Sequence, residues 1–271
     1  MLGKFSKNAV LAIYALLILV PLLVVVFGSF KTTPELFKSP FGLPSSANLS
    51  NYGEALGSQN LGGAFINSAV VTVCSVSITL FVASLAAYGV SRIPGWKGWL
   101  IFGVMVIGMS VPAQANMIPQ YVLFDSLGLL DSLIGLILIN IVASLPVAVF
   151  ILGGFMKTLP KDLYEASTVD GSGPWRTYYA IALPLSLPSV AATAIFLFVM
   201  HWNELLYPLL FIQSEGKRTL PLALLSFQGE FQTNYPLLFS GVALSSIPIV
   251  IAYVFLQRFF VAGMTAGAVK G

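Results

Sequence analysis

His201 and Glu204 are the titratable residues whose spacing first suggests chemistry, because they stand three residues apart near the end of a long apolar run. Residues three apart on a helix share one face, so the imidazole and the carboxylate could act together. A metal site needs more ligands than this pair offers, and His201 is the only histidine in the chain. A carboxylate at membrane depth is costly and marks a candidate functional site. We interpret the pair as part of an outer gate or of a structural polar network.

Other reactive groups are scarce in this chain. The only cysteine, Cys74, lies in an apolar run and is expected to be a small buried hydrophobe rather than a disulfide partner or metal ligand. Gly216 and Lys217 are followed by Arg218 instead of Ser or Thr, so the chain lacks a phosphate-binding loop of its own. We therefore expect no cofactor or metal on this chain. Its small net charge of +3 gives no reason to expect nucleic acid as a partner.

Amide side chains at membrane depth form a second set of candidates. The stretch SVPAQANMIPQY carries two prolines that interrupt a regular helix, together with several amides, and a later apolar run carries another. Such groups must face protein or water rather than lipid. They could form hydrogen bonds between helices, or they could line a polar pathway. The candidate pathway residues are Gln114, Asn116, Asn140, Asn203 and Glu204.

The elements that position these side chains follow from composition. The 271 residues are 57% hydrophobic and 8% charged, whereas a soluble domain carries about 25% charge. A membrane helix needs about 20 mostly apolar residues, and each of six charge-free intervals can hold one. We predict an all-α membrane protein whose single transmembrane domain covers 1–271. Its spans are expected near 9–30, 66–90, 99–122, 133–156, 185–211 and 238–260.

The distribution of lysine and arginine predicts the orientation. With the N-terminus inside, nine of the thirteen cations fall in cytoplasmic segments, which favours cytoplasmic N- and C-termini. The first apolar run is longer than a signal-peptide core, so we expect it to remain as the first span.

One inner loop, 157–184, is more elaborate than an ordinary connection. Pro160 and Asp162 are typical of a helix start, and a helix is expected to run to about Asp170. Gly171 can adopt positive φ and turn the chain. Ser172 is expected to cap a second short helix begun by Pro174. An amphipathic interfacial loop is the simpler interpretation, but the small residues of the first helix suit close docking better than lipid contact.

The loop resembles a known family. Its residues Glu165-Ala166-Ser167, Gly171 and Ile181-x-Leu183-Pro184 match the EAA–G–I-x-LP loop of bacterial ABC-importer permeases, with Ser167 where alanine is more frequent. The stretch 202–209, WNELLYPL, is similar to the WNEF-type motif of the carbohydrate branch, with Leu205 in place of Phe. The segments 118–121 and 127–129 and the tail 263–271 are similar to the second permease subunit of maltose-type transporters.

The resemblance implies a function, a coupling mechanism and a set of partners. The helix near 160–170 would dock on a cytoplasmic ATPase through Glu165, Ala166, Ser167, Asp170 and the bend at Gly171, with Ile181, Leu183 and Pro184 completing the motif. Tail residues Thr265, Ala266, Gly267 and Lys270 would also contact the ATPase; the tail from Phe259 is expected to be flexible or extended. ATP and Mg would be bound on two such ATPase subunits. A second homologous permease subunit, an extracytoplasmic solute-binding protein and the lipid of a bacterial inner membrane complete the expected assembly.

Other functions are weighed against this one. An importer of a non-sugar solute could carry the same loop. A secondary transporter would need an ionisable pair at the midplane, and it often shows an internal repeat, which we do not find. A membrane enzyme would need a cluster of His, Asp or Glu at membrane depth, which one histidine and one glutamate do not provide.

Overall fold

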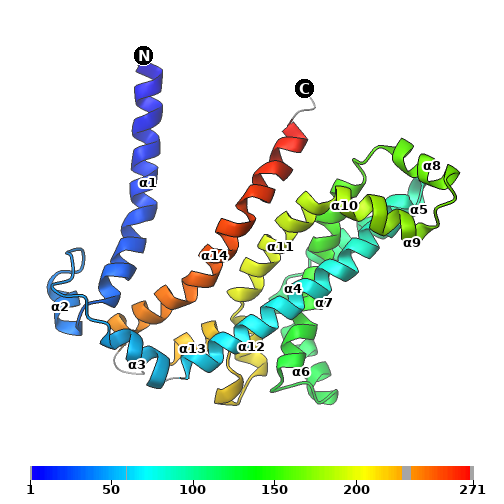
Figure 1. Ribbon diagram of the computed structural model, residues 1–271. Helices are drawn as coiled ribbons and strands as arrows, with labels where there is room; N and C mark the ends of the chain where they lie inside the picture. The colour runs from blue at the N-terminus through cyan, green and yellow to red at the C-terminus, as the bar shows by residue number, and fades with distance from the viewer. Residues whose placement is uncertain (1, 59, 228–232, 269–271) are drawn as a thin grey trace. The chain divides into compact units, whose positions relative to one another are not determined.

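The computed structural model describes residues 2–58, 60–227 and 233–268, and every element in these ranges is a helix (Figure 1). The chain divides into two compact units, one of residues 1–66 and 218–248 and the other of residues 67–217 and 249–271. The helices α4 (Leu61–Arg92) and α14 (Tyr235–Ala268) each contribute residues to both units.

The larger unit is built around α7 (Leu133–Met156), whose bounds are those predicted from the sequence. α5 (Gly95–Met109) and α11 (Leu187–Trp202) pack against α7, and small residues let them approach closely. A Cβ at Gly153, for example, would lie 3.1 Å from the Phe102 ring of α5. The core consists of apolar side chains of α4, α7 and α11, most of them small or branched: Val76, Ala83, Ala87, Ala148, Val149, Leu152, Met156 and Leu197.

The helical segments at the two ends of α7 differ. At its N-terminal end lie α6 (Met117–Ser126) and α12 (Leu206–Phe211), and after its C-terminal end come α8 (Lys161–Val169) and α9 (Pro174–Thr177) (Figure 1). A π-helical turn η2 (Tyr178–Ala182) and α10 (Leu183–Leu185) then lead to α11. This arrangement separates the 157–184 loop from the residues around Asp131 by the length of α7.

The smaller unit holds α1 (Leu2–Ser29), α2 (Thr33–Lys38), α3 (Ser50–Ser58), α13 (Leu220–Leu225) and the first part of α14. Its loop after α1 is folded around Lys31, which is fully buried. The Lys31 Nζ donates to the carbonyls of Ser39 at 2.8 Å and Gly42 at 2.6 Å. The loop is therefore an ordered structure organised by one buried cation.

Four described helices are long and apolar enough to cross a membrane: Lys7–Ser29, Leu61–Arg92, Leu133–Met156 and Tyr235–Phe255. Two bent pairs bring the number to six if each pair is one span. The predicted span over 99–122 is interrupted, as its prolines indicate, because α5 ends at Met109 and a 3-10 turn η1 (Ala113–Asn116) precedes α6, with an 82° bend between the pair. Pro112 lies in this break, whereas Pro119 lies in the first turn of α6, where its missing N–H costs little.

The predicted span over 185–211 is also interrupted. α11 ends at Trp202 and α12 begins at Leu206, so the 202–209 motif marks a break between two helices. At the other end of the chain, α14 continues to Ala268. The expectation of a flexible or extended tail from Phe259 is therefore wrong as far as Ala268. Thr265, Ala266 and Gly267 lie in this helix, although their side chains lie outside the described ones, and Lys270 lies outside the described residues altogether.

Candidate functional site

The helix α8 presents a continuous exposed face. The exposed residues on it follow the i, i+3, i+4, i+7, i+8 spacing of one helix side: Asp162, Glu165, Ala166, Val169 and Asp170. Asp162 occupies the first turn, as predicted. Val169 is 89% exposed, which is unusual for a branched apolar residue outside a lipid-facing span. The face can therefore offer carboxylates to cations of a partner and an apolar contact to its surface.

The end of α8 is a Schellman motif centred on Gly171. The Ser172 N–H donates to the Ser167 carbonyl at 2.9 Å, and the Gly171 N–H donates to the Thr168 carbonyl at 3.0 Å. Gly171 has φ of +72°, the left-handed conformation that glycine adopts at little cost. The predicted bend is confirmed. The predicted cap at Ser172 is wrong, because the N-cap of α9 is Gly173 and no side chain caps that helix.

The opposite face of α8 is held by the chain itself. Ser167 is 4% exposed, and its hydroxyl forms a 2.8 Å hydrogen bond with the hydroxyl of Thr177 in α9. The Thr177 hydroxyl also donates to the Gly173 carbonyl at 3.2 Å. Ser167 was expected on the docking surface by resemblance, but its burial places it in the support of the loop, between α8 and α9.

Three tyrosines join the loop to α4. The rings of Tyr164 and Tyr178 lie 6.4 Å and 5.5 Å from that of Tyr88, and the Tyr178 hydroxyl is 2.7 Å from the hydroxyl of Ser84. The Arg92 guanidinium lies 4.3 Å from the centre of the Tyr164 ring, a cation–π contact. Burial raises the pKa of Tyr164, while the nearby positive charge of Arg92 lowers it. α8 is thus attached to α4 by aromatic packing and a few hydrogen bonds.

The second half of the loop motif lies where the chain turns into the next span. Ile181 belongs to the π-helical turn η2, and Leu183 and Pro184 belong to α10. The segment Pro174–Leu185 meets α11 at an angle of 72°. Pro184 has no N–H to donate, and both prolines and π-helical turns are recognised causes of sharp helix bends. The motif therefore forms the corner that links the loop to α11.

A polar network lies inside the larger unit. His201 and Asn140 are buried, and the His201 Nε2 lies 3.2 Å from the Ser144 hydroxyl. Ser144 donates to the Asn140 carbonyl at 2.7 Å and lies 3.3 Å from the Thr79 hydroxyl. The network connects α4, α7 and α11, which agrees with the structural interpretation of His201. Among the described residues no group of three His, Cys, Asp or Glu side chains could hold a metal ion.

The remaining pathway candidates are dispersed. Gln114 is exposed and Asn116 half-buried, both in or beside η1. Asn203 is exposed and donates to the Val199 carbonyl at 2.8 Å. Glu204 Oε1 accepts from the N–H of Leu206 at 2.8 Å and of Tyr207 at 3.3 Å, so this carboxylate, one residue before the N-cap Leu205, satisfies the first two N–H groups of α12. Within the described ranges, no hydrogen bond joins one of the five pathway candidates to another.

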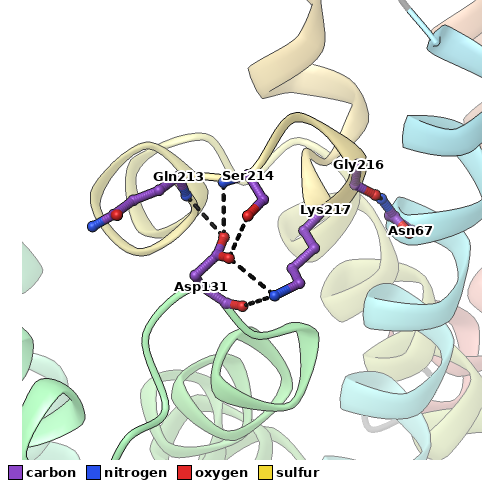
Figure 2. Close-up of polar contacts among 6 residues, drawn as sticks. All are labelled: Asn67, Asp131, Gln213, Ser214, Gly216 and Lys217. Atoms are coloured by element: carbon purple, nitrogen blue, oxygen red, sulfur yellow. Dashed lines mark hydrogen bonds and ion pairs between the residues drawn. The ribbon is translucent and has the colours of Figure 1, made fainter.

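A second constellation, the Asp131 network, consists of Asp131, Gln213, Ser214 and Lys217 (Figure 2). The Asp131 carboxylate accepts from the N–H groups of Gln213 at 3.0 Å and Ser214 at 2.9 Å, from the Ser214 hydroxyl at 2.5 Å and from Lys217 Nζ at 2.9 Å. The Asn67 amide of α4 donates to the Gly216 carbonyl at 2.9 Å. These bonds join the ends of α4, α7 and α12.

The environment of Asp131 is specialised for an ionised carboxylate. Its φ of +46° is a left-handed conformation that aspartate tolerates better than most residues. Hydrogen bonds from Ser214, followed by those from Lys217, hold the pKa of Asp131 well below its usual range. No pattern in the sequence suggested these contacts. The partners lie more than 80 residues away, so no local pattern could have identified them.

The comparisons with known proteins agree with this architecture. Residues 79–266 match the family described as the binding-protein-dependent transport system inner membrane component, and the chain belongs to that family. It is therefore a membrane permease component of a transport system.

Two relatives extend the similarity over nearly the whole chain. The diacetylchitobiose uptake system permease protein NgcG of Streptomyces coelicolor is 32% identical over 97% of this chain and 88% of its own length. The multiple sugar-binding transport system permease protein MsmG of Streptococcus mutans is 34% identical over 99% and 98%. A bacterial ABC transporter involved in import of the polysaccharide alginate has one chain that superposes with a TM-score of 0.81 at 20% identity, covering 96% of both chains. This likeness confirms the all-α fold.

Proposed function

We propose that this chain is one of two permease subunits of an ABC importer for a sugar or an oligosaccharide. Two ATPase subunits, which bind ATP and Mg, would drive it from the cytoplasm, and an extracytoplasmic binding protein would deliver the solute. Family membership supports the reliance on a binding protein. The names of the relatives, which specify sugars, support the solute class. The chain would lie in the bacterial inner membrane with both termini in the cytoplasm.

The observation that carries the coupling proposal is the two-sided construction of α8. One face exposes Glu165, Ala166 and Val169 to solvent. The other face is held by the contacts of Ser167 with Thr177 and of Tyr164 with Arg92. A docked ATPase subunit would contact the exposed face. Because the buried face is attached to α4 and α9, a displacement of α8 would be transmitted to these helices rather than absorbed within the loop.

The corner at 181–186 provides a second connection. The chain passes from α9 through η2 and α10 into α11, and α11 packs on α7. A rotation of the loop would therefore change the tilt of α11 directly. Glu204 and Asn203 stand at the far end of α11, where a change of tilt would move the break before α12. The pathway candidates near this break are thus placed to respond to motion at α8.

Transport by the reconstituted importer tests the proposal. Glu165→Ala and Gly171→Pro are expected to abolish ATP-driven uptake and to weaken copurification of the ATPase, while the subunit remains in the membrane. Asp125→Ala, which removes an exposed carboxylate at the end of α6, is the matched control and is expected to retain uptake. Full uptake by both loop variants would exclude the coupling role.

Two further measurements separate the competing functions. Identification of the ligand carried by the copurified binding protein decides between a sugar and another solute. Uptake by this chain alone in proteoliposomes, driven by an ion gradient without ATP, would instead indicate a secondary transporter.

A further inference from the structure

A pocket of about 470 Å³ lies between α8 and the turn that joins α4 to α5. Three cations line it, Arg92, Lys157 and Lys161, against one carboxylate, Glu165. In the part of the chain that the structure describes, none of the three cations forms an ion pair. A concave site with an excess of positive charge is suited to an anion.

One of the residues that line this pocket has a buried hydroxyl without a hydrogen-bond partner. Tyr164 lines the pocket and is 4% exposed, and its hydroxyl has no hydrogen-bond partner among the described residues. Buried polar atoms in folded proteins are nearly always bonded, so an unpartnered one calls for a ligand or a water molecule. A tyrosine hydroxyl can donate to an anionic oxygen.

Two of the cations are held in position by aromatic rings. Arg92 lies over the Tyr164 ring, and Lys157 Nζ lies 3.9 Å from the centre of the Phe102 ring. These contacts hold two cations, one from the end of α4 and one from the end of α7, in the lining of the pocket. A phosphate group has several acceptor oxygens, so it could accept hydrogen bonds from more than one cation of the pocket.

We propose that this pocket binds a phosphate group, supplied by the headgroup of an anionic phospholipid. The headgroup source is favoured by Trp99, which lines the pocket and is 74% exposed, and by Trp96, which is 69% exposed in the same turn. Tryptophan is enriched at the headgroup level of membranes, and cations beside a span attract anionic lipid. A soluble phosphate offers the same chemistry without acyl chains.

The site has a consequence for α8. A bound phosphate would connect α8 to the ends of α4 and α7 in addition to the tyrosine contacts. The pocket is lined by this chain alone, and one of its residues, Glu165, also belongs to the exposed face of α8.

Native mass spectrometry of the full chain, purified with its partner subunits, tests the proposal. The protein is exchanged into mixed phosphatidylglycerol and phosphatidylcholine, and the lipids retained after detergent washing are counted. Wild type is expected to retain phosphatidylglycerol in preference to phosphatidylcholine. The double variant Arg92→Gln/Lys157→Gln should bind phosphatidylglycerol more weakly than wild type, by about tenfold for each cation removed. Lys97→Gln removes an exposed cation in the first turn of α5 that does not line the pocket, and this variant should retain wild-type affinity for phosphatidylglycerol.

A conservative variant guards against unfolding as the cause of any loss. Tyr164→Phe keeps the ring that Arg92 contacts and removes only the hydroxyl, so a several-fold loss of retained lipid with unchanged thermal unfolding would support a direct contact. Titration with inorganic phosphate forms the second arm. If wild type binds phosphate, the double variant does not, and no lipid is retained selectively, the pocket is a phosphate site for a soluble ligand. Equal retention of both lipids in all variants, with no pocket-dependent phosphate binding, would overturn the proposal.

Discussion

The hydrogen bond between Ser167 and Thr177 should determine how firmly α8 is held. Ser167→Ala removes one buried hydrogen bond, but Thr177 keeps its bond to the Gly173 carbonyl. The expected cost is therefore about 1 kcal/mol. Thr177→Val instead leaves the buried Ser167 hydroxyl without this partner, which costs about 2 kcal/mol. Opening of α8 away from α9 should thus become about 5-fold more frequent in the first variant and about 30-fold more frequent in the second.

Hydrogen exchange measured by mass spectrometry on the assembled importer reports this opening through the amides of α8 and α9. Thr168→Ala is the matched control, because its hydroxyl donates at 2.9 Å to the Tyr164 carbonyl within α8 and does not reach α9. The double variant Ser167→Ala/Thr177→Val should cost less than the sum of the two single changes, since it leaves no orphaned hydroxyl. Exchange in Thr177→Val that is no faster than in Thr168→Ala would refute the role assigned to this bond.

Three further predictions concern other parts of the chain. Because the pKa of Asp131 is depressed, the stability that its carboxylate contributes is present above the unfolded pKa of about 3.9 and is lost only as pH falls through the folded pKa. Hydrogen-exchange protection factors for the amides of Gln213 and Ser214 should therefore be equal at pH 8 and pH 5, and Asp131→Asn should lower both. Gly171→Ala should destabilise the end of α8 by about 1 kcal/mol through its φ alone, since a Cβ there meets nothing within 4 Å, and Gly171→Asn should cost less in the same exchange experiment. Lys31→Met should leave carbonyls of the loop after α1 without their donor and destabilise it by about 1–3 kcal/mol, seen as faster proteolysis of that loop; unchanged cleavage would contradict the role of this buried cation.

The sequence predicts the spans well where charge bounds them. α7 runs from Leu133 to Met156 as expected, because Asp131 and Lys157 enclose a charge-free, mostly apolar run. α8 could be predicted equally well from the sequence, because Pro160, Asp162 and Gly171 are local signals for the start and end of a helix. The exposed position of Val169 also follows from the spacing of Asp162, Glu165 and Ala166, although the sequence alone did not single it out.

The features that sequence patterns miss depend on contacts between distant segments. Prolines indicate the interruption within 99–122, but hydropathy treats 185–211 as one uniform run and does not reveal the break after Trp202. The burial of Ser167 depends on where Thr177 lies, and the Asp131 network pairs residues from separate loops. Glu204 looked like a functional carboxylate because the sequence places it near the end of a membrane span. The N–H groups that it binds are free only because α11 ends at Trp202 and α12 begins anew at Leu206.

Cross-linking from the exposed face of α8 tests the central claim most directly. Val169→Cys, in a chain whose single cysteine is replaced by Cys74→Ala, can carry a benzophenone-maleimide probe in the assembled importer. A covalent adduct with the ATPase subunit is expected on illumination, and no such adduct is expected from the same probe at Asp125→Cys, beyond the opposite end of α7. No ATPase adduct from position 169, or equal adducts from both positions, would contradict the claim that the ATPase drives this subunit through α8.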